Sequence, residues 1–305
     1  MLIYAVKRLS VAILVALTVS LLTFSMIYLS GDPAMALAGE AATQADIENI
    51  RRVYGYDQPI YVQYFDWLGN ALKGNLGQSH YLNSPVSEVI FTRLPVTMIL
   101  GASALSFGLL LAIPLGVLAA MRPNTLLDRF ALGLAVIGQA LPSFWFALIM
   151  IFFFGVALRW LPITGSDSWL NFVMPSIALG YYITPAVMRL TRAGMIEVLS
   201  SDYIRTARAK GLRPSVVLFK HALRNAIIPV VSLAAVQFGF MLGGSIVIET
   251  IFAINGLGQL AWESILRADL PMMQAIVLVL SCFYIILTLV ADILNAFLDP
   301  RIRVS

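Results

Sequence analysis

Six apolar runs that contain no Asp, Glu, Lys or Arg divide this sequence. A helix that crosses the roughly 30 Å hydrocarbon core of a bilayer needs about 20 such residues, and each of the runs is at least that long. We therefore predict an all-α, polytopic membrane protein with six transmembrane helices. The runs cover residues 9–29, 94–121, 130–158, 168–188, 225–248 and 270–291.

The overall composition excludes several classes of protein. Hydrophobic residues make up 60% of the 305 residues and charged residues only 12%, whereas soluble domains are about half apolar and about a quarter charged. A soluble globule of this size could not bury so much apolar surface. The composition therefore excludes a soluble enzyme, a disordered chain and a nucleic-acid-binding module.

Charges in the connecting segments predict the orientation. If the N-terminus is cytoplasmic, the inner segments hold 14 Lys or Arg and 5 Asp or Glu, and the outer segments hold 6 and 11. Cytoplasmic loops of membrane proteins carry an excess of Lys and Arg. We therefore expect both termini in the cytoplasm, and the small basic excess of the chain reports orientation rather than a polyanionic partner.

The first apolar run allows a second interpretation. Lys7 and Arg8 precede it, and Ala36-Leu37-Ala38 resembles the small-residue cleavage site of a signal peptide. The apolar core of a signal peptide is usually about 7–15 residues long, which is shorter than this run. An uncleaved first span is therefore favoured, and cleavage is the alternative.

The outer segment 30–93 is expected to be helical. Thr43 and Asp46 have the spacing of a capping box, and further amphipathic stretches begin near Pro59 and Ser84. The segment is either a helical cap on the outer surface or a docking surface for an extracytoplasmic partner, and the two are compatible. In the second stretch, the residues expected on one face are Ile60, Tyr64, Trp67 and Leu68.

The chain lacks the residues of an autonomous pump or enzyme. The runs hold no ionisable residue for proton or ion coupling, and the absence of a Gly-Lys dipeptide excludes a phosphate-binding loop of the Walker type. His80 and His221 are expected on opposite sides of the membrane, and Cys282 is the only cysteine, so no metal site is predicted. Energy for uphill transport would have to come from another subunit.

Uncharged polar side chains within the runs are candidates for a translocation pathway. Such groups would bind a solute weakly enough to release it. The candidates are Gln139, Tyr182, Gln237 and Gln274.

The most basic segment, 189–224, holds 8 of the 20 Lys and Arg residues. Ser201 or Asp202 could cap a short helix that continues to Lys210, and Gly211 could end it in a left-handed conformation. Its exposed face would mix basic residues with small and apolar ones. This pattern fits either insertion into a groove of a partner or a solvated basic loop that only fixes the topology.

The same segment resembles the signature loop of binding-protein-dependent ABC importer permeases. Matching motifs elsewhere include Gly74-Asn75-Leu76-Gly77, Trp160-Leu161-Pro162 and Glu249-Thr250-Ile251-Phe252, so the resemblance covers nearly the whole chain. It is closest to the dipeptide, oligopeptide, glutathione and nickel branch, as the first permease of the pair. The signature residues are Asp202, Tyr203, Ile204, Arg205, Thr206, Ala207, Arg208, Ala209, Lys210 and Gly211.

Two positions depart from the general family motif. The Glu-Ala-Ala segment of the family corresponds to Arg205-Thr206-Ala207, which has no acidic residue. The proline expected about thirteen residues after the motif glycine is replaced by Arg224, and a proline follows only at Pro229. The resemblance implies that the residues from Asp202 to Gly211, except Ile204, couple this chain to the ATPase. The two departures lie in or near this contact.

The resemblance implies a type I importer fold of about six helices in the cell membrane of a prokaryote. The chain would pair with a second paralogous permease, two ATP-binding subunits that hold ATP and Mg²⁺, and an extracytoplasmic solute-binding protein, and would itself bind no cofactor. The expected parts are the first span within 1–29, the outer segment 30–93 and a five-helix core, 94–305, that carries the coupling loop 189–224.

The transported solute stays open at this stage. Small peptides, including dipeptides, longer peptides and glutathione, are expected, and nickel or an opine is the alternative within the family. Outside it, the alternatives are a secondary transporter or channel that acts alone and a membrane anchor without transport activity.

Overall fold

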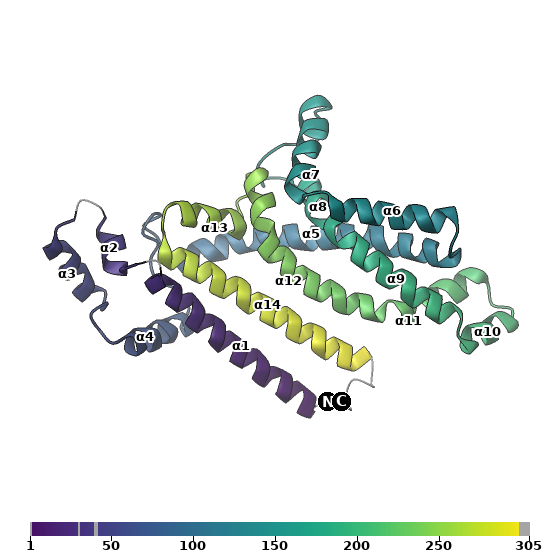
Figure 1. Cartoon of the computed structure of the whole chain (residues 1–305), viewed down its shortest axis with the longest axis horizontal. Helices are drawn as coiled ribbons and strands as arrows, with labels where there is room; N and C mark the ends of the chain where they lie inside the picture. The colour runs from purple at the N-terminus through teal and green to yellow at the C-terminus, as the bar shows by residue number, and fades with distance from the viewer. Residues whose placement is uncertain (1, 30, 40–41, 299–305) are drawn as a thin grey trace.

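The computed structural model describes residues 2–29, 31–39 and 42–298, and it is an elongated bundle of helices (Figure 1). Five helical segments within these residues are long and apolar enough to cross a membrane. They comprise most of α1 (Leu2–Leu29), α5 (Val86–Met121), the consecutive helices from Trp169 to Leu199, α12 (Ile228–Ile251) and most of α14 (Leu270–Leu298).

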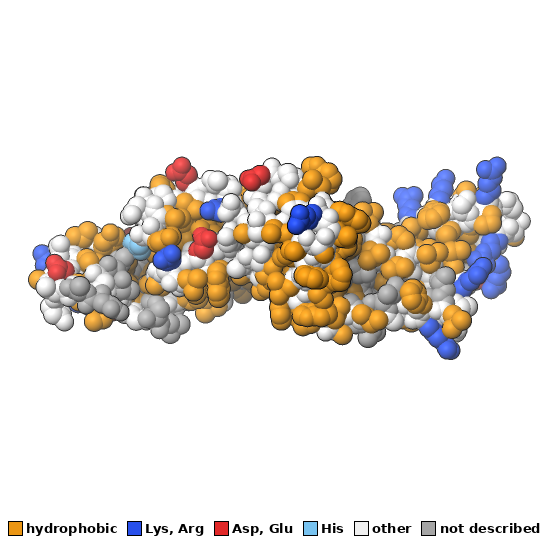
Figure 2. Space-filling model, turned by 90° about the horizontal axis from the view of Figure 1, so that it is seen from above, with side chains coloured by type: hydrophobic (Ala, Val, Ile, Leu, Met, Phe, Trp, Pro, Cys, Tyr) orange, Lys and Arg blue, Asp and Glu red, His pale blue; other side chains and the backbone are white. Residues whose placement is uncertain are grey.

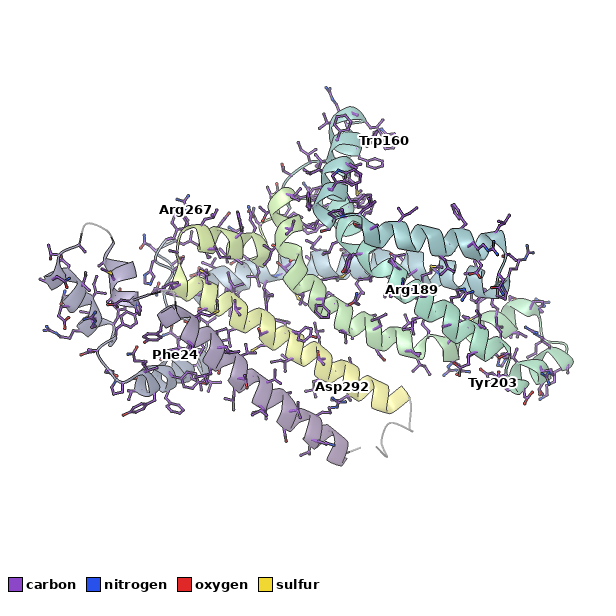
Figure 3. The ribbon with its side chains drawn as sticks, in the orientation of Figure 1. Phe24, Trp160, Arg189, Tyr203, Arg267 and Asp292 are labelled. Carbon is purple, nitrogen blue, oxygen red and sulfur yellow. The ribbon has the colours of Figure 1, made fainter. Side chains whose placement is uncertain are left out.

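The prediction of one span over residues 130–158 is wrong. This run is divided into α6 (Leu126–Ala140), α7 (Ser143–Met150) and the π-helical η1 (Ile151–Ala157). Leu141 between them is extended, with φ −86° and ψ 125°, because the ring of Pro142 disfavours helical geometry in the preceding residue. In Figure 1, α6 runs along the bundle and the α7 segment projects outward from it, with Trp160 near the tip of the projection in Figure 3.

The helix after the fourth run also differs from the expectation. The segment consists of η2 (Trp169–Phe172), α8 (Val173–Gly180), η3 (Tyr181–Ile183) and α9 (Thr184–Leu199), which follow one another directly. Helix α9 therefore extends eleven residues into the expected loop 189–224. Arg192 on α9 donates two hydrogen bonds, of 2.6 and 2.7 Å, to the buried carboxylate of Asp128 on α6, and this pairing allows a charged stretch to remain in the bundle.

Helix α5 forms the centre of the bundle and packs closely against α8 and α9. The first of these contacts depends on glycine, because a Cβ on Gly180 of α8 would overlap the carbonyl oxygen of Ala104 on α5. A Cβ on Gly116 of α5 would lie 2.8 Å from the carbonyl oxygen of Met188 on α9. Small residues thus bring the helix backbones together, as is common between membrane helices.

The outer segment contains α2 (Pro33–Ala38), α3 (Gln44–Val53) and α4 (Ile60–Leu72). The predicted capping box is confirmed: the Asp46 amide donates to Thr43 Oγ1 at 3.3 Å, and the Thr43 amide donates to Asp46 Oδ2 at 3.0 Å. Tyr64 and Trp67 of α4 pack on Phe24 of α1, with ring centroids 5.4 and 5.8 Å apart.

The two ends of the described chain lie on one side of the bundle. Helices α1 and α14 run antiparallel next to each other (Figure 1), and Arg8 of α1 forms a 3.1 Å ion pair with Asp292 of α14. Figure 2 shows the densest group of Lys and Arg at one tip of the molecule, whereas the visible Asp and Glu lie in the opposite half, interspersed with further Lys or Arg. This separation of charge agrees with the orientation expected from the loops.

Candidate functional site

The candidate coupling helix, α10 (Asp202–Ala209), lies at one tip of the bundle, where Figure 3 labels Tyr203. Its inner face is formed by Ile204, which is fully buried, and Ala207, which is 7% exposed. Both belong to an apolar cluster with residues from the nearby ends of α5 and α9. The other members are Val117, Ala120, Met195, Val217, Ala222 and Ala226.

The outer face of α10 is open. Tyr203 is 44% exposed, and its hydroxyl accepts a 2.9 Å hydrogen bond from Asn225 Nδ2. Asp202 and Arg205 form a 3.2 Å ion pair in which both side chains are largely exposed, so it contributes little to stability. All the predicted coupling residues except Ala207 are on this exposed side. They are Asp202, Tyr203, Arg205, Thr206, Arg208, Ala209, Lys210 and Gly211.

Both ends of α10 lie at or within one residue of the predicted positions, but the predicted capping hydrogen bond is absent. Ser201 is the N-cap residue, but its hydroxyl donates back to the Val198 carbonyl at 2.6 Å and makes no capping bond to α10. The helix ends at Ala209 rather than Lys210. Gly211 follows with φ +71°, which confirms the predicted left-handed position.

A second helical segment packs next to α10 at the tip of the bundle. The π-helical η4 (Val216–Leu223) and α11 (Arg224–Ala226) lead from the tip back to α12. A Cβ on Gly194 of α9 would lie 3.0 Å from the Ala226 carbonyl oxygen, so this return segment packs directly on α9. The expected loop is therefore a folded helical tip in which α10 has a fixed position.

The four candidate pathway residues lie on four different helices, α6, η3, α12 and α14. Tyr182 is 56% exposed on η3, Gln237 is half-buried near the middle of α12, and Gln274 is 6% exposed near the start of α14. The side chain of Gln139 lies outside the described residues. Gln237 is about 21 Å along the helix from the end of α12 at Ile251, at 1.5 Å per residue, whereas Gln274 is in the second turn of α14. A shared pathway lining stays a prediction.

A buried carboxylate that the sequence analysis did not single out lies at the other end of α12. The predicted span ended before Glu249 because this residue is charged, but α12 continues to Ile251 and Glu249 is fully buried. Its carboxylate accepts hydrogen bonds from Thr97 Oγ1 at 2.8 Å, Ser245 Oγ at 2.9 Å and the Gln259 amide at 3.0 Å. The sequence held one indication of its importance, because Glu249 begins the motif Glu249-Thr250-Ile251-Phe252 that matches the family.

The Glu249 carboxylate joins three elements. Thr97 belongs to α5, and the Gln259 amide lies in the first turn of α13 (Leu257–Leu266). A Cβ on Gly256 would overlap this carboxylate, so only glycine allows the chain to turn around it. The carboxylate therefore fixes α13 to the ends of α5 and α12.

The described residues contain no group of three or more His, Cys, Asp or Glu side chains close enough to hold a metal ion. The arrangement is suited to transmitting motion. Helix α10 is held in place at one tip, and long helices connect that tip to the hydrogen-bonded junction at Glu249. Displacement of α10 would act on α5 and α9 through the apolar cluster that contains Ile204.

Comparison with known proteins extends these observations. The family model described as "Binding-protein-dependent transport system inner membrane component" matches residues 112–304. The model described as "Binding-prot-dependent transport system membrane comp, N-term" matches residues 1–101. Together they cover nearly the whole chain, including the outer segment.

Individual relatives agree in length. The glutathione transport system permease protein GsiC of Escherichia coli strain K12 is 41% identical over 304 residues, which is 99% of both chains. The protein of the same name from Pectobacterium atrosepticum is also 41% identical, again over 99% of both chains.

A solved structure is similar in fold. A chain of the MetNI methionine ABC transporter, in an inward-facing conformation, superposes with a TM-score of 0.59 at 19% identity, covering 69% of this chain and 96% of that one. The bundle described above is thus the fold of an ABC importer permease. The chain belongs to the family of binding-protein-dependent ABC importer permeases, as a non-catalytic, multi-pass subunit of the bacterial inner membrane.

Proposed function

We propose that this chain is the permease subunit that passes glutathione or short peptides inward, driven by ATP hydrolysis on two partner subunits that contact α10. The observation that supports this proposal most directly is the geometry of α10. One face of this helix is buried through Ile204 and Ala207, and the other face is exposed at the basic tip of the bundle. The full-length relatives named as glutathione permeases support the choice of solute.

The contacts support a rigid-body mechanism. The buried face of α10 packs on the end of α5, a helix of 36 residues that is about 54 Å long at 1.5 Å per residue. About 30 Å further along the same helix from Val117, at 1.5 Å per residue, Thr97 hydrogen-bonds to Glu249. A displacement of α10 by the ATP-binding subunits would therefore move α5 and the outer junction together, which is how packed helices transmit domain motions.

The remaining parts of the transporter follow from this mechanism. A second, paralogous permease completes the pathway, to which Tyr182 and Gln237 contribute uncharged polar groups. The ATP-binding subunits hold ATP and Mg²⁺, and a solute-binding protein delivers the solute on the outer side. Closure of the ATP-binding subunits opens the pathway outward, and hydrolysis resets it.

The test is substitution of Gly211 by Asp in the transporter reconstituted with its ATPases and binding protein. A Cβ at Gly211 would meet no atom within 4 Å, and Asp tolerates a left-handed conformation better than most residues. The fold is therefore expected to persist, while the bulk and negative charge obstruct docking of the partner. We expect ATP-driven glutathione uptake to fall at least about tenfold, since about 1.4 kcal/mol of lost coupling gives that factor.

Gly39→Asp is the matched control. Gly39 has φ +79° and also has no atom within 4 Å of an added Cβ, but it lies in the outer segment. Uptake by this variant should be unchanged. Full ATP-coupled uptake in Gly211→Asp would contradict the coupling role of α10.

The same preparation separates the alternatives. Uptake of a nickel chelate or an opine, without uptake of glutathione or peptides, would place the chain in another substrate class. Concentrative uptake by the chain without any ATP-binding subunit would identify a secondary transporter.

A further inference from the structure

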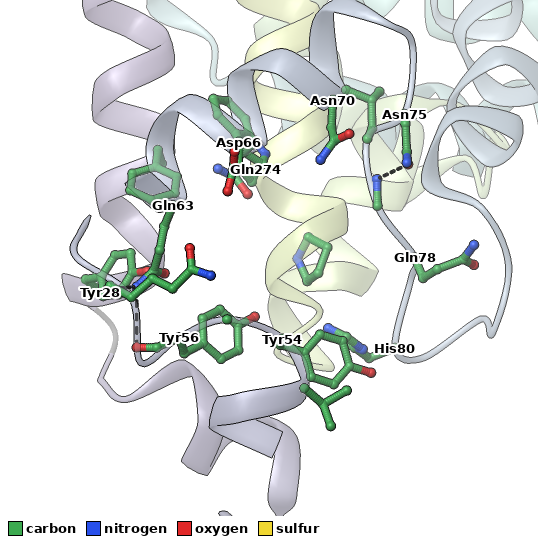
Figure 4. Close-up of a pocket in the computed structure, with 18 of the residues that line it drawn as sticks. Tyr28, Tyr54, Tyr56, Gln63, Asp66, Asn70, Asn75, Gln78, His80 and Gln274 are labelled. Atoms are coloured by element: carbon green, nitrogen blue, oxygen red, sulfur yellow. Dashed lines mark hydrogen bonds between the residues drawn. The ribbon is translucent and has the colours of Figure 1, made fainter. Parts of the chain in front are cut away.

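A pocket of about 640 Å³ lies between the outer segment and the start of α14 (Figure 4). Its walls come from the end of α1, the chain from Arg52 to Trp67, the loop around Gln78, and Gln274 on α14. Small-molecule sites typically measure about 300–1,000 Å³, so the space suits a small solute. The pocket is separate from α10, which lies at the opposite tip.

Two glutamine side chains in this pocket have different surroundings. Gln63 is fully engaged: its Oε1 accepts from the Tyr28 hydroxyl, and its Nε2 donates to the backbone carbonyls of Gln58 at 2.7 Å and Tyr56 at 3.3 Å. Gln274 is 6% exposed, and its Nε2 has no hydrogen-bond partner. An unpaired buried donor costs about 1–3 kcal/mol, and an acceptor on a ligand would remove that cost.

The rest of the lining is polar and carries both signs of charge. Arg52 and Asp66 are the two fully charged residues of the lining, and both are exposed. Burial lowers the pKa of His80 although Asp269 opposes the shift, which favours the neutral imidazole with one donor and one acceptor. Uncharged hydrogen-bonding and aromatic side chains supply the remaining contacts, among them Tyr54, Tyr56, Trp67, Asn70 and Asn75.

We propose that this pocket binds a short zwitterionic peptide on the extracytoplasmic side. A peptide carbonyl or carboxylate would accept the free hydrogen bond of Gln274 Nε2, the α-amino group would lie toward Asp66, and the C-terminal carboxylate toward Arg52. The inference deepens the proposed function and rests on it for the choice of a peptide. It adds a solute site on the permease, formed jointly by the outer segment and α14.

The experiment measures equilibrium binding of radiolabelled Gly-Gly-Gly to the assembled transporter in nanodiscs, without the solute-binding protein. Gln274→Leu removes the carboxamide and keeps a similar volume, and it should weaken binding about tenfold. Asp66→Asn tests an exposed position that does not support the fold. It should weaken binding of Gly-Gly-Gly but not of its N-acetylated form, which has no α-amino charge.

Gln44→Leu is the matched control, because Gln44 is exposed on α3 and does not line the pocket. It should bind as the unaltered protein does. The proposal is overturned if the unaltered transporter does not bind Gly-Gly-Gly, or if Gln274→Leu and Asp66→Asn both bind it with unchanged affinity.

Uptake measurements distinguish this inference from the proposed function. If glutathione and peptides are taken up normally while the pocket binds no peptide, the pocket proposal fails and the proposed function stands. If neither is taken up by the complete transporter, the proposed function fails.

Discussion

Glu249 shows how a charged residue is accommodated inside this bundle. Three groups from three elements donate hydrogen bonds to its carboxylate, namely Thr97 Oγ1, Ser245 Oγ and the Gln259 amide. Buried polar groups in proteins are satisfied in this way. The sequence placed the end of a span at this charge, and it could not indicate that donors from α5 and α13 would surround it.

Glu249→Ala is expected to destabilise the fold. The change leaves Thr97 Oγ1 and the Gln259 amide without their acceptor, and unsatisfied buried groups cost about 1–3 kcal/mol each. We expect the free energy of unfolding of the purified chain in detergent to fall by at least about 2 kcal/mol. Glu88→Ala, at an exposed position of α5, should change it by less than about 0.5 kcal/mol. Equal stability of the two variants would show that the Glu249 junction is not needed.

His80 gives the outer segment a dependence on pH. Burial lowers the pKa of its imidazole below the ordinary 6.5, and the Asp269 carboxylate opposes the shift. The unfolded chain therefore binds more protons than the folded chain as the pH falls through 6.5, so the free energy of unfolding decreases on acidification and is restored above that pH.

Thermal melting at pH 7.5 and 5.5 measures this dependence. We expect a smaller loss of melting temperature on acidification in His80→Gln than in the unaltered chain. An identical loss in both proteins would mean that protonation of His80 does not contribute.

At the scale of elements, the close contact between α5 and α8 depends on Gly180. Gly180→Ala would place a methyl group on the Ala104 carbonyl oxygen, and such overpacking costs about 1–3 kcal/mol. Gly244→Ala is the matched control because Gly244 lies within α12 with no atom within 4 Å of an added Cβ. Melting of the isolated chain should decrease in temperature for Gly180→Ala only. A tolerated Gly180→Ala would contradict the packing described here.

Sequence periodicity and hydropathy predicted most elements correctly, but not the division of the run 130–158. Both α6 and the α7–η1 segment are apolar, so the bend between them leaves the hydropathy unchanged, and Pro142 is the local signal. In the outer segment, the capping box of Thr43 and Asp46 depends on residues three apart and was therefore predictable. The amphipathic face of α4 was right for Tyr64 and Trp67 but not for Ile60, which is 61% exposed.

At the scale of the whole molecule, the features that the sequence did not reveal depend on contacts between distant residues. The pocket at Gln274 exists because the outer segment is tied to the start of α14, where the buried Asp269 accepts hydrogen bonds from the Ser79 hydroxyl and the Tyr81 amide. The tip that carries α10 was predictable as a local motif, with Gly211 as its terminator. Its rigid attachment to α5 was not, because it needs the tertiary cluster around Ile204.

The central claim is that the motion driven by ATP hydrolysis on the partner subunits is transmitted to this chain through α10. Site-directed crosslinking tests this claim most directly. In a Cys282→Ser background, Arg208→Cys places a thiol on the exposed face of α10, and Lys73→Cys places one on the outer side as a control. The account predicts that a short bifunctional reagent joins position 208, and not position 73, to an ATP-binding subunit of the assembled transporter and blocks ATP-driven uptake. Failure of position 208 to crosslink to any ATP-binding subunit in an active transporter would contradict it.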